Sequence, residues 1–232
     1  MNGDPTLRPS CALILVCIGM PIPAASPNTD RNIDMCTIYI IRHGQTDLNK
    51  KHVLQSRIDA PLNDDGIMQA EDAGERLRSD GIFFDMIFSS PLKRAVQTAR
   101  IIAGDDVPLQ IDDRLLEMDY GPYEGVDLTS PPPEITLFFS DFVNNPAPEG
   151  METLDSVVER AGQFLEHLKN GAPGGSILIS THAIMMKGLL EYLTPDSGGS
   201  YWATYIKNCD IYVSDLKDGA FTVPKPLWQT VF

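Results

Sequence analysis

Two histidines and two arginines could together form a site for phosphoryl chemistry. Arg42 and His43 directly follow an apolar, strand-like run, and His182 directly follows a later run of the same kind. Arg94 lies in a helical stretch that begins just after a further such run. The loops at the carboxyl ends of parallel strands share one edge of a sheet, so these four side chains are expected to meet there. The fork of an arginine matches phosphoryl oxygens, and a neutral imidazole is a competent nucleophile at about pH 7.

An alternation of strand and helix patterns would position these residues. Strands are expected at residues 35–41, 85–89, 109–111, 176–180, 210–216 and 220–223. Helices are expected at about residues 66–78, 91–103, 153–169 and 182–192. This alternation predicts an α/β fold in three layers, with a mostly parallel central sheet and helices on both of its faces.

The composition is that of an ordinary globular chain with a strongly acidic balance. The 232 residues are 43% hydrophobic and 22% charged, which excludes wholesale disorder, a collagen-like repeat and a multispan membrane protein. The chain has 18 Lys and Arg against 32 Asp and Glu, a formal net charge of −14. Such a chain repels nucleic acid and anionic membranes over most of its surface, so no nucleic-acid partner is expected. An anionic substrate would need a local basic cluster, which Arg42 and Arg94 would supply.

Five sequence blocks surround these residues in order along the chain. They are RHGQTDLN (42–49), DAPLNDDGIMQA (59–70), SSPLKRAVQTA (89–99), LLEMDYGPYEG (115–125) and STHAI (180–184). With these blocks the chain resembles the histidine phosphatase superfamily, in its phosphoglycerate mutase-like phosphatase branch, over about residues 35–213. The resemblance implies the phosphoglycerate mutase-like α/β fold. No cofactor is expected.

The resemblance also implies a role for each matched residue. His43 matches the histidine that attacks phosphorus and becomes a phosphohistidine, which water then hydrolyses. Arg42, Arg94 and His182 match the groups that hold the phosphoryl oxygens and stabilise the charge of the transition state. Glu117 matches the acid that protonates the leaving oxygen and later activates water.

Three further residues match the family's weaker substrate contacts. Gln45 and Asn49 match polar contacts to the phosphoryl group, and Arg57 is a candidate third arginine. The alternative for each of the three is that it only stabilises the loop after the first strand.

Simpler interpretations compete with the catalytic roles. His43 or His182 alone would more often be a hydrogen-bonded structural histidine, and only the matched blocks around both favour catalysis. Asp119 or Glu124 could take the acid role assigned to Glu117, since both stand close to it in sequence. A metal site built from the two histidines and a carboxylate is disfavoured, because neither an HExxH nor a paired-cysteine spacing is present.

The chain departs from the family pattern at two positions. Ala183 follows the second block's histidine where glycine is usual, and Ser56 stands where the loop of the first block usually has glycine. The methyl group of Ala183 either narrows the pocket floor or costs nothing, depending on its backbone dihedrals. Ser56 bears on the placement of Arg57. Neither departure removes a catalytic group.

Residues 118–150 read as a long irregular segment, which is expected to act as a lid or binding element. Its aromatic residues Phe138, Phe139 and Phe142 are expected to pack within the lid rather than to stack on substrate. From Leu115 to Glu159 the chain has ten carboxylates and no lysine or arginine. A lid of this composition offers no ion-pair partner to a second acidic group on a substrate.

Hydrolysis is therefore favoured over isomerisation of a phosphoglycerate. The mutases of this family carry an arginine just after the catalytic glutamate, where this chain has Met118. The expected substrate is a small phosphorylated metabolite, a monoester whose alcohol part is neutral or cationic. Two alternatives stay open, namely mutase-type phosphoryl transfer and a non-catalytic phosphate-binding protein on the same fold. The chain is expected to be a monomer or a homodimer.

Residues 1–34 are expected to lie outside the folded domain of residues 35–232. Residues 11–20 are apolar but too few to span a bilayer, and a Pro-rich linker follows them, so no integral membrane span is expected. A dispensable tail would leave the protein cytoplasmic, whereas a signal peptide would mean export. Cys36 and Cys209 are expected to be buried free thiols.

Overall fold

The computed structural model describes residues 36–171 and 174–228 of the chain. The expected tail at residues 1–34 and the expected domain start at Met35 lie outside the described residues. The division into tail, domain and lid therefore stays a prediction.

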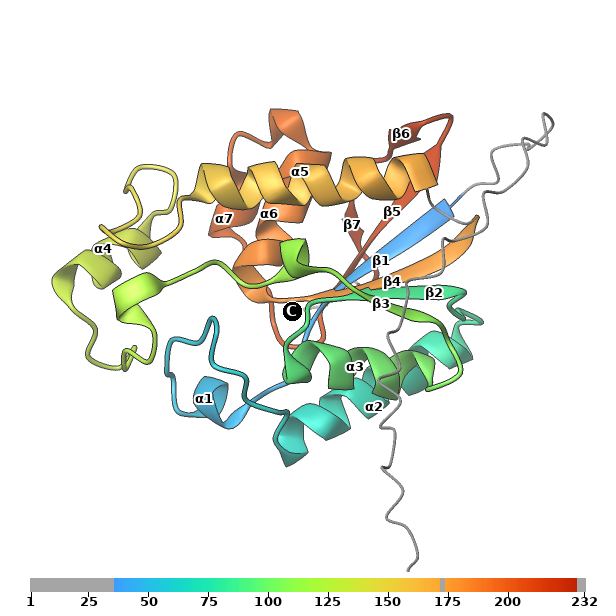
Figure 1. The fold of residues 1–232 in the computed structure, drawn as a ribbon, viewed down its shortest axis with the longest axis horizontal. Helices are drawn as coiled ribbons and strands as arrows, with labels where there is room; N and C mark the ends of the chain where they lie inside the picture. The colour runs from blue at the N-terminus through green and yellow to red at the C-terminus, as the bar shows by residue number, and fades with distance from the viewer. Residues whose placement is uncertain (1–35, 172–173, 229–232) are drawn as a thin grey trace, which may run out of the picture. The chain divides into compact units, whose positions relative to one another are not determined.

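Seven strands of the described residues form one sheet at the centre of the fold (Figure 1). They are β1 (Cys36–Arg42), β2 (Met86–Ser89), β3 (Leu109–Ile111), β4 (Gly175–Thr181), β5 (Ile211–Lys217), β6 (Ala220–Phe221) and β7 (Lys225–Pro226). The order is β3-β2-β4-β1-β5-β6, and β7 pairs with β5. The first four strands in this order are mutually parallel, and β5 to β7 add antiparallel pairings. The expectation of a mostly parallel α/β sheet is confirmed.

The central strands form because their sequences are apolar and rich in β-branched residues. β1 reads CTIYIIR and is buried along most of its length, as expected for a strand covered on both faces. β4 lies beside it in parallel register, with Arg42 opposite Thr181. This register brings the ends of the two strands to the same level, so the residues that follow them leave the sheet side by side.

Four long helices cover the sheet. α2 (Asp64–Ser79) and α3 (Lys93–Ala103) lie on one face, and α5 (Leu154–Gly171) and α6 (Ala183–Leu193) lie on the other (Figure 1). The buried apolar residues form two clusters, one associated with each pair of helices. Helices on both faces and the three-layer arrangement are thus confirmed. The shorter elements are α1 (Asp47–Lys50), α4 (Pro133–Ser140), α7 (Ser200–Ala203) and the 3-10 turns η1 (Asp113–Leu115), η2 (Gly121–Tyr123) and η3 (Pro195–Ser197).

The segment 118–150 is less irregular than its sequence indicated, because it contains α4. This eight-residue helix begins at a proline, a residue suited to the first turn, and buries Ile135 and Phe138. The Phe138 ring packs edge-on against Phe139 and Phe142, with ring centroids 5.3 and 4.9 Å away. Tertiary packing of these rings stabilises a helix that is too short to form by propensity alone. The aromatic residues pack with one another, as expected.

The structure also bears on the two cysteines of the domain and on the expected absence of a membrane span. Cys36 and Cys209 are free and buried, and burial raises their pKa values to about 11 and about 12. In the described residues, no helix combines the length and apolarity needed to cross a membrane.

Candidate active site

The two histidines meet at the carboxyl edge of the parallel strands. His43 directly follows β1, and its backbone N–H donates to the carbonyl of Thr181, the last residue of β4, at 2.9 Å. His182 follows Thr181 and is the N-cap of α6. The two imidazole rings have centroids 5.1 Å apart. The convergence that the strand pattern predicted is therefore observed.

His43 is held as a neutral imidazole with one ring nitrogen left unprotonated. Its Nδ1 lies 2.7 Å from the carbonyl oxygen of Gly44, which can only accept a hydrogen bond. The proton must therefore sit on Nδ1, and Nε2 keeps its lone pair. Burial, reinforced by the charges of Arg94 and Arg42, holds the pKa of His43 well below its ordinary value of 6.5. This is the protonation state that a nitrogen nucleophile needs.

Arg94 is completely buried between the two imidazoles and a loop of the chain. Its Nη1 and Nη2 donate to the carbonyls of Ile58 and Ser56, both at 2.8 Å. Its Nε lies 3.3 Å from Nε2 of His43 and 3.2 Å from Nδ1 of His182. Burial lowers the pKa of Arg94 to about 10, so the guanidinium remains charged at neutral pH. A fixed positive charge thus lies beside Nε2 of His43.

His182 and Arg42 complete the basic side of the site. His182 is fully buried, and its Nε2 lies 2.8 Å from Oγ of Ser90. Burial, then the charge of Arg94, holds the pKa of His182 well below 6.5. Arg42 donates from Nη1 to the carbonyl of Ile206 at 2.6 Å, whereas its buried Nε has no hydrogen-bond partner among the described residues. An unpaired buried donor on an arginine suits an oxyanion ligand.

Glu117 lies at the N-terminus of α6 with its carboxylate buried. Its Oε1 accepts hydrogen bonds from the N–H groups of Met118, Ile184 and Met185 at 3.0, 3.1 and 3.0 Å. Its Oε2 has only the longer contact with the N–H of Ile184, at 3.3 Å. The first N–H groups of a helix lack partners within the helix, which explains why a buried oxygen acceptor fits here. Because His182 is the N-cap of α6, one helix terminus positions both groups.

The two competing carboxylates are occupied by structural contacts. Asp119 accepts from the N–H of Gly121 at 2.8 Å, and its second oxygen lies 3.6 Å from Nε of Arg57. Glu124 accepts three backbone hydrogen bonds, from the N–H groups of residues 56, 57 and 58 at 2.7, 2.9 and 3.1 Å. Glu124 therefore shapes the loop whose carbonyls bind Arg94. Glu117 accepts backbone hydrogen bonds as well, so the assignment of the acid role to Glu117 stays a prediction.

The three candidates for weaker substrate contacts lie in the loops around the site. Oε1 of Gln45 accepts from Nδ2 of Asn63 at 3.0 Å. Asn49 forms a capping box with Thr46 at the start of α1. Arg57 is partly exposed and faces Asp119, as described above. The observed contacts of Gln45 and Asn49 are those of the loop-stabilising alternative, and a substrate contact of any of the three stays a prediction.

One glycine and the two departures from the family pattern lie close to the site. A Cβ at Gly44 would collide with the backbone carbonyl of Gly66 at the start of α2, so this close approach requires glycine. Ala183 is the first residue of α6, where alanine is the best helix former, so its methyl group has no backbone cost. Ser56 uses its N–H for Glu124 and its carbonyl for Arg94, functions that do not require a glycine.

A buried lysine near the site was not identified from the sequence. Lys187 lies on the buried side of α6, and its Nζ donates to the carbonyl of Trp202 at 2.7 Å and lies 4.8 Å from the ring centre of Phe142. Burial lowers its pKa to about 8, while the carboxylate of Glu117 acts in the opposite direction. A lone lysine within the apolar run AIMMKGLLEYL is the only signal for it in the sequence.

In the described ranges, no three His, Cys, Asp or Glu side chains are arranged so that they could hold a metal ion. The arrangement instead combines one unprotonated imidazole nitrogen and a buried arginine beside it, with a second arginine and one carboxylate at the same edge of the sheet. Such a set can bind a phosphoryl group, attack it and exchange a proton with its ester oxygen.

Known proteins are similar to this chain in sequence and in fold. A family model described as histidine phosphatase superfamily (branch 1) matches residues 38–227. The chain is 36% identical to an uncharacterized phosphatase, PhoE, of Bacillus subtilis (strain 168) over 166 residues, 71% of this chain and 79% of PhoE. It is 31% identical to a 2,3-bisphosphoglycerate-dependent phosphoglycerate mutase of Bifidobacterium longum (strain DJO10A), covering 67% of this chain and 76% of the mutase. A solved structure of a putative alpha-ribazole-5'-P phosphatase from Escherichia coli matches with a TM-score of 0.71 at 25% identity, covering 84% of this chain and 96% of that one.

Proposed function

Since the chain belongs to the histidine phosphatase superfamily, we propose that it hydrolyses a small phosphate monoester through a phosphohistidine on His43. The observation that carries this proposal is the hydrogen bond from Nδ1 of His43 to the carbonyl of Gly44, which leaves Nε2 unprotonated. Arg94 lies 3.3 Å from that nitrogen and supplies the positive charge that a phosphoryl group needs beside the nucleophile.

In the first step the phosphoryl oxygens are bound by Arg42, Arg94 and His182. Nε2 of His43 attacks phosphorus, an N–P bond forms and the P–O bond to the alcohol breaks. Glu117 gives a proton to the leaving oxygen. Oε2 is the oxygen proposed to carry this proton, because backbone N–H groups occupy Oε1 more closely.

In the second step water replaces the alcohol. Glu117, now a carboxylate, takes a proton from the attacking water, an O–P bond forms and the N–P bond to His43 breaks. Inorganic phosphate leaves, and both residues return to their starting states. The acid of the first step thus acts as the base of the second.

The acidic segment around Glu117 favours an ester whose alcohol part is neutral or cationic. Most of the ten carboxylates between Leu115 and Glu159 lie on or near the 118–150 segment, which has no basic side chain of its own. A second acidic group on the substrate would meet this segment with little to neutralise it. Phosphoglycerate mutase activity is the second candidate, because a mutase is among the chain's relatives. It is less favoured because Met118 stands where the family pattern of the mutases has an arginine.

Phosphate release from a panel of monoesters tests the proposal. The panel contains 3-phosphoglycerate with and without its bisphosphate, sugar phosphates and α-ribazole phosphate, and every assay contains EDTA. We expect wild type and the exposed-histidine control His167→Ala to release phosphate, and His43→Ala to lose at least about 10³-fold in rate. Isomerisation of 3-phosphoglycerate without release would identify a mutase. A rise in melting temperature with vanadate but no turnover of any ester would identify a binding protein.

A further inference from the structure

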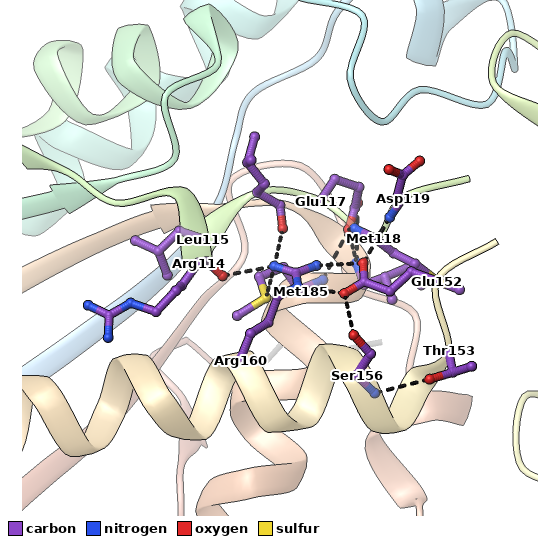
Figure 2. Close-up of polar contacts among 12 residues, drawn as sticks. Arg114, Leu115, Glu117, Met118, Asp119, Glu152, Thr153, Ser156, Arg160 and Met185 are labelled. Atoms are coloured by element: carbon purple, nitrogen blue, oxygen red, sulfur yellow. Dashed lines mark hydrogen bonds and ion pairs between the residues drawn. The ribbon is translucent and has the colours of Figure 1, made fainter. Parts of the chain in front are cut away.

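A buried ion pair connects α5 to the segment that carries Glu117. Glu152 lies just before α5 and Arg160 lies within it. The guanidinium of Arg160 binds the carboxylate of Glu152 at two points, Nε to Oε1 at 2.7 Å and Nη2 to Oε2 at 3.0 Å. Only 16% and 12% of the two side chains are exposed. Figure 2 shows the pair between α5 and residues 114–119.

Arg160 holds the chain just before Glu117. Its Nη1 donates to the carbonyl of Arg114 at 2.8 Å (Figure 2). The same nitrogen donates to the carbonyl of Leu116 at 2.6 Å. The same nitrogen lies 2.9 Å from Sδ of Met185, whose backbone N–H donates to Glu117. One guanidinium therefore contacts both the segment that carries the carboxylate and a residue that binds it.

Glu152 holds the chain just after Glu117. Its Oε2 accepts from the N–H of Asp119 at 2.9 Å, and its own N–H donates to the carbonyl of Asp119 at 2.8 Å. Burial raises the pKa of Glu152, but its bonds to Arg160 outweigh this and bring the pKa below the ordinary 4.5. The pair therefore stays charged at neutral pH and keeps both of its backbone contacts.

The geometry points to Glu152 and Arg160 as positioning residues that hold Glu117 within reach of the leaving oxygen of the substrate. This inference rests on the proposed function. Between η1 and η2 the segment around Glu117 has no helix or strand of its own to fix it. A displacement of about 1 Å in a catalytic group costs on the order of 10²-fold in rate. Both flanks of Glu117 are anchored by side chains of one ion pair, so breaking the pair weakens both anchors.

Substrates with different leaving groups distinguish positioning from general stability. A general acid matters most when the leaving alcohol is a poor leaving group, and matters little for p-nitrophenyl phosphate. We expect Glu152→Gln and Arg160→Lys each to lower kcat/KM for an alkyl phosphate by about 10- to 100-fold. For p-nitrophenyl phosphate the loss should be less than about 3-fold. The matched control is Glu166→Gln, which removes another ion pair of α5, that with Lys169, and should leave both rates unchanged.

Combination with Glu117→Gln makes the test decisive. If the pair acts through Glu117, adding Glu152→Gln or Arg160→Lys to Glu117→Gln should cost little more on the alkyl ester. Equal losses on both esters, or losses that multiply with that of Glu117→Gln, would overturn the inference while leaving the proposed function intact. If Glu117→Gln itself were indifferent to the leaving group, the acid role in the proposed function would fail, and this inference with it. Arg160→Lys keeps the charge and Glu152→Gln keeps the shape, so both test the folded protein.

Discussion

The basic side and the acidic side of the site are built in different ways. His43 and His182 directly follow β1 and β4, so the register of two parallel strands sets their separation. Glu117 lies on a segment without helix or strand, which side chains from α5 and backbone N–H groups of α6 hold in place. The proposed nucleophile is therefore positioned by two paired strands, and the proposed proton donor by individual polar contacts.

This difference predicts different responses to mutation. Changes on the basic side should affect every substrate alike, because all phosphate monoesters carry the same phosphoryl group. Changes on the acidic side should depend on the leaving group, because only the leaving oxygen needs the proton.

Arg94→Lys should lower kcat/KM by about 10²- to 10³-fold for alkyl and aryl phosphates alike. A lysine cannot donate to the carbonyls of Ser56 and Ile58 and also reach both imidazoles, as the guanidinium does. Steady-state kinetics on both esters measures the effect, with Arg100→Lys on the same helix as control. A loss confined to the alkyl ester would contradict the account.

Glu117→Gln should lower kcat/KM for an alkyl phosphate by about 10²-fold or more and affect p-nitrophenyl phosphate far less. The amide keeps the size of the side chain but has no acidic proton to give to the ester oxygen. The ratio of the two rates, compared between variant and wild type, gives the result. An unchanged ratio would remove Glu117 from the acid role.

Glu124→Gln should lower kcat/KM by about 10-fold with no dependence on the leaving group. The amide nitrogen cannot accept from the backbone, so at least one of the three N–H groups of residues 56–58 loses its partner, at a cost of about 1–3 kcal/mol. The loosened loop then binds Arg94 less firmly. Dependence on the leaving group would instead mean that Glu124 acts on the acidic side.

The neutral histidines should make the protein less stable in acid. Folding lowers the pKa values of His43 and His182, so below pH 6.5 the unfolded chain binds protons that the folded chain does not. The contribution of these histidines to the free energy of unfolding is therefore complete above pH 6.5. It decreases as the pH falls below 6.5, by at most about 1.4 kcal/mol per pH unit for each histidine. Urea unfolding at several pH values measures the slope, which should be shallower for His43→Gln. Equal slopes would show that His43 is not held neutral by the fold.

The sequence was sufficient to locate the basic side, because its determinants are local. An apolar β-rich run followed by Arg42 and His43, and another followed by His182, place these residues once the strands are parallel neighbours. Short-range patterns also predicted α2, α3, α5 and α6 to within a few residues.

The acidic side could not be located in the same way, because contacts between distant residues define it. Glu124 binds a loop that lies 66 to 68 residues earlier, and Arg160 binds carbonyls 44 and 46 residues earlier. No spacing in a single sequence indicates such pairs, and α4 likewise depends on the packing of its aromatic rings. Glu117 was identified from a family resemblance, not from its own surroundings.

Detection of the covalent intermediate tests the central claim most directly. The enzyme is mixed with a good substrate and quenched in alkali, where an N–P bond survives, and its peptides are then analysed by mass spectrometry. We expect one phosphoryl group on the peptide that contains His43, and none in His43→Ala. Turnover of the substrate with phosphate on no histidine, or on His182 instead, would contradict the account.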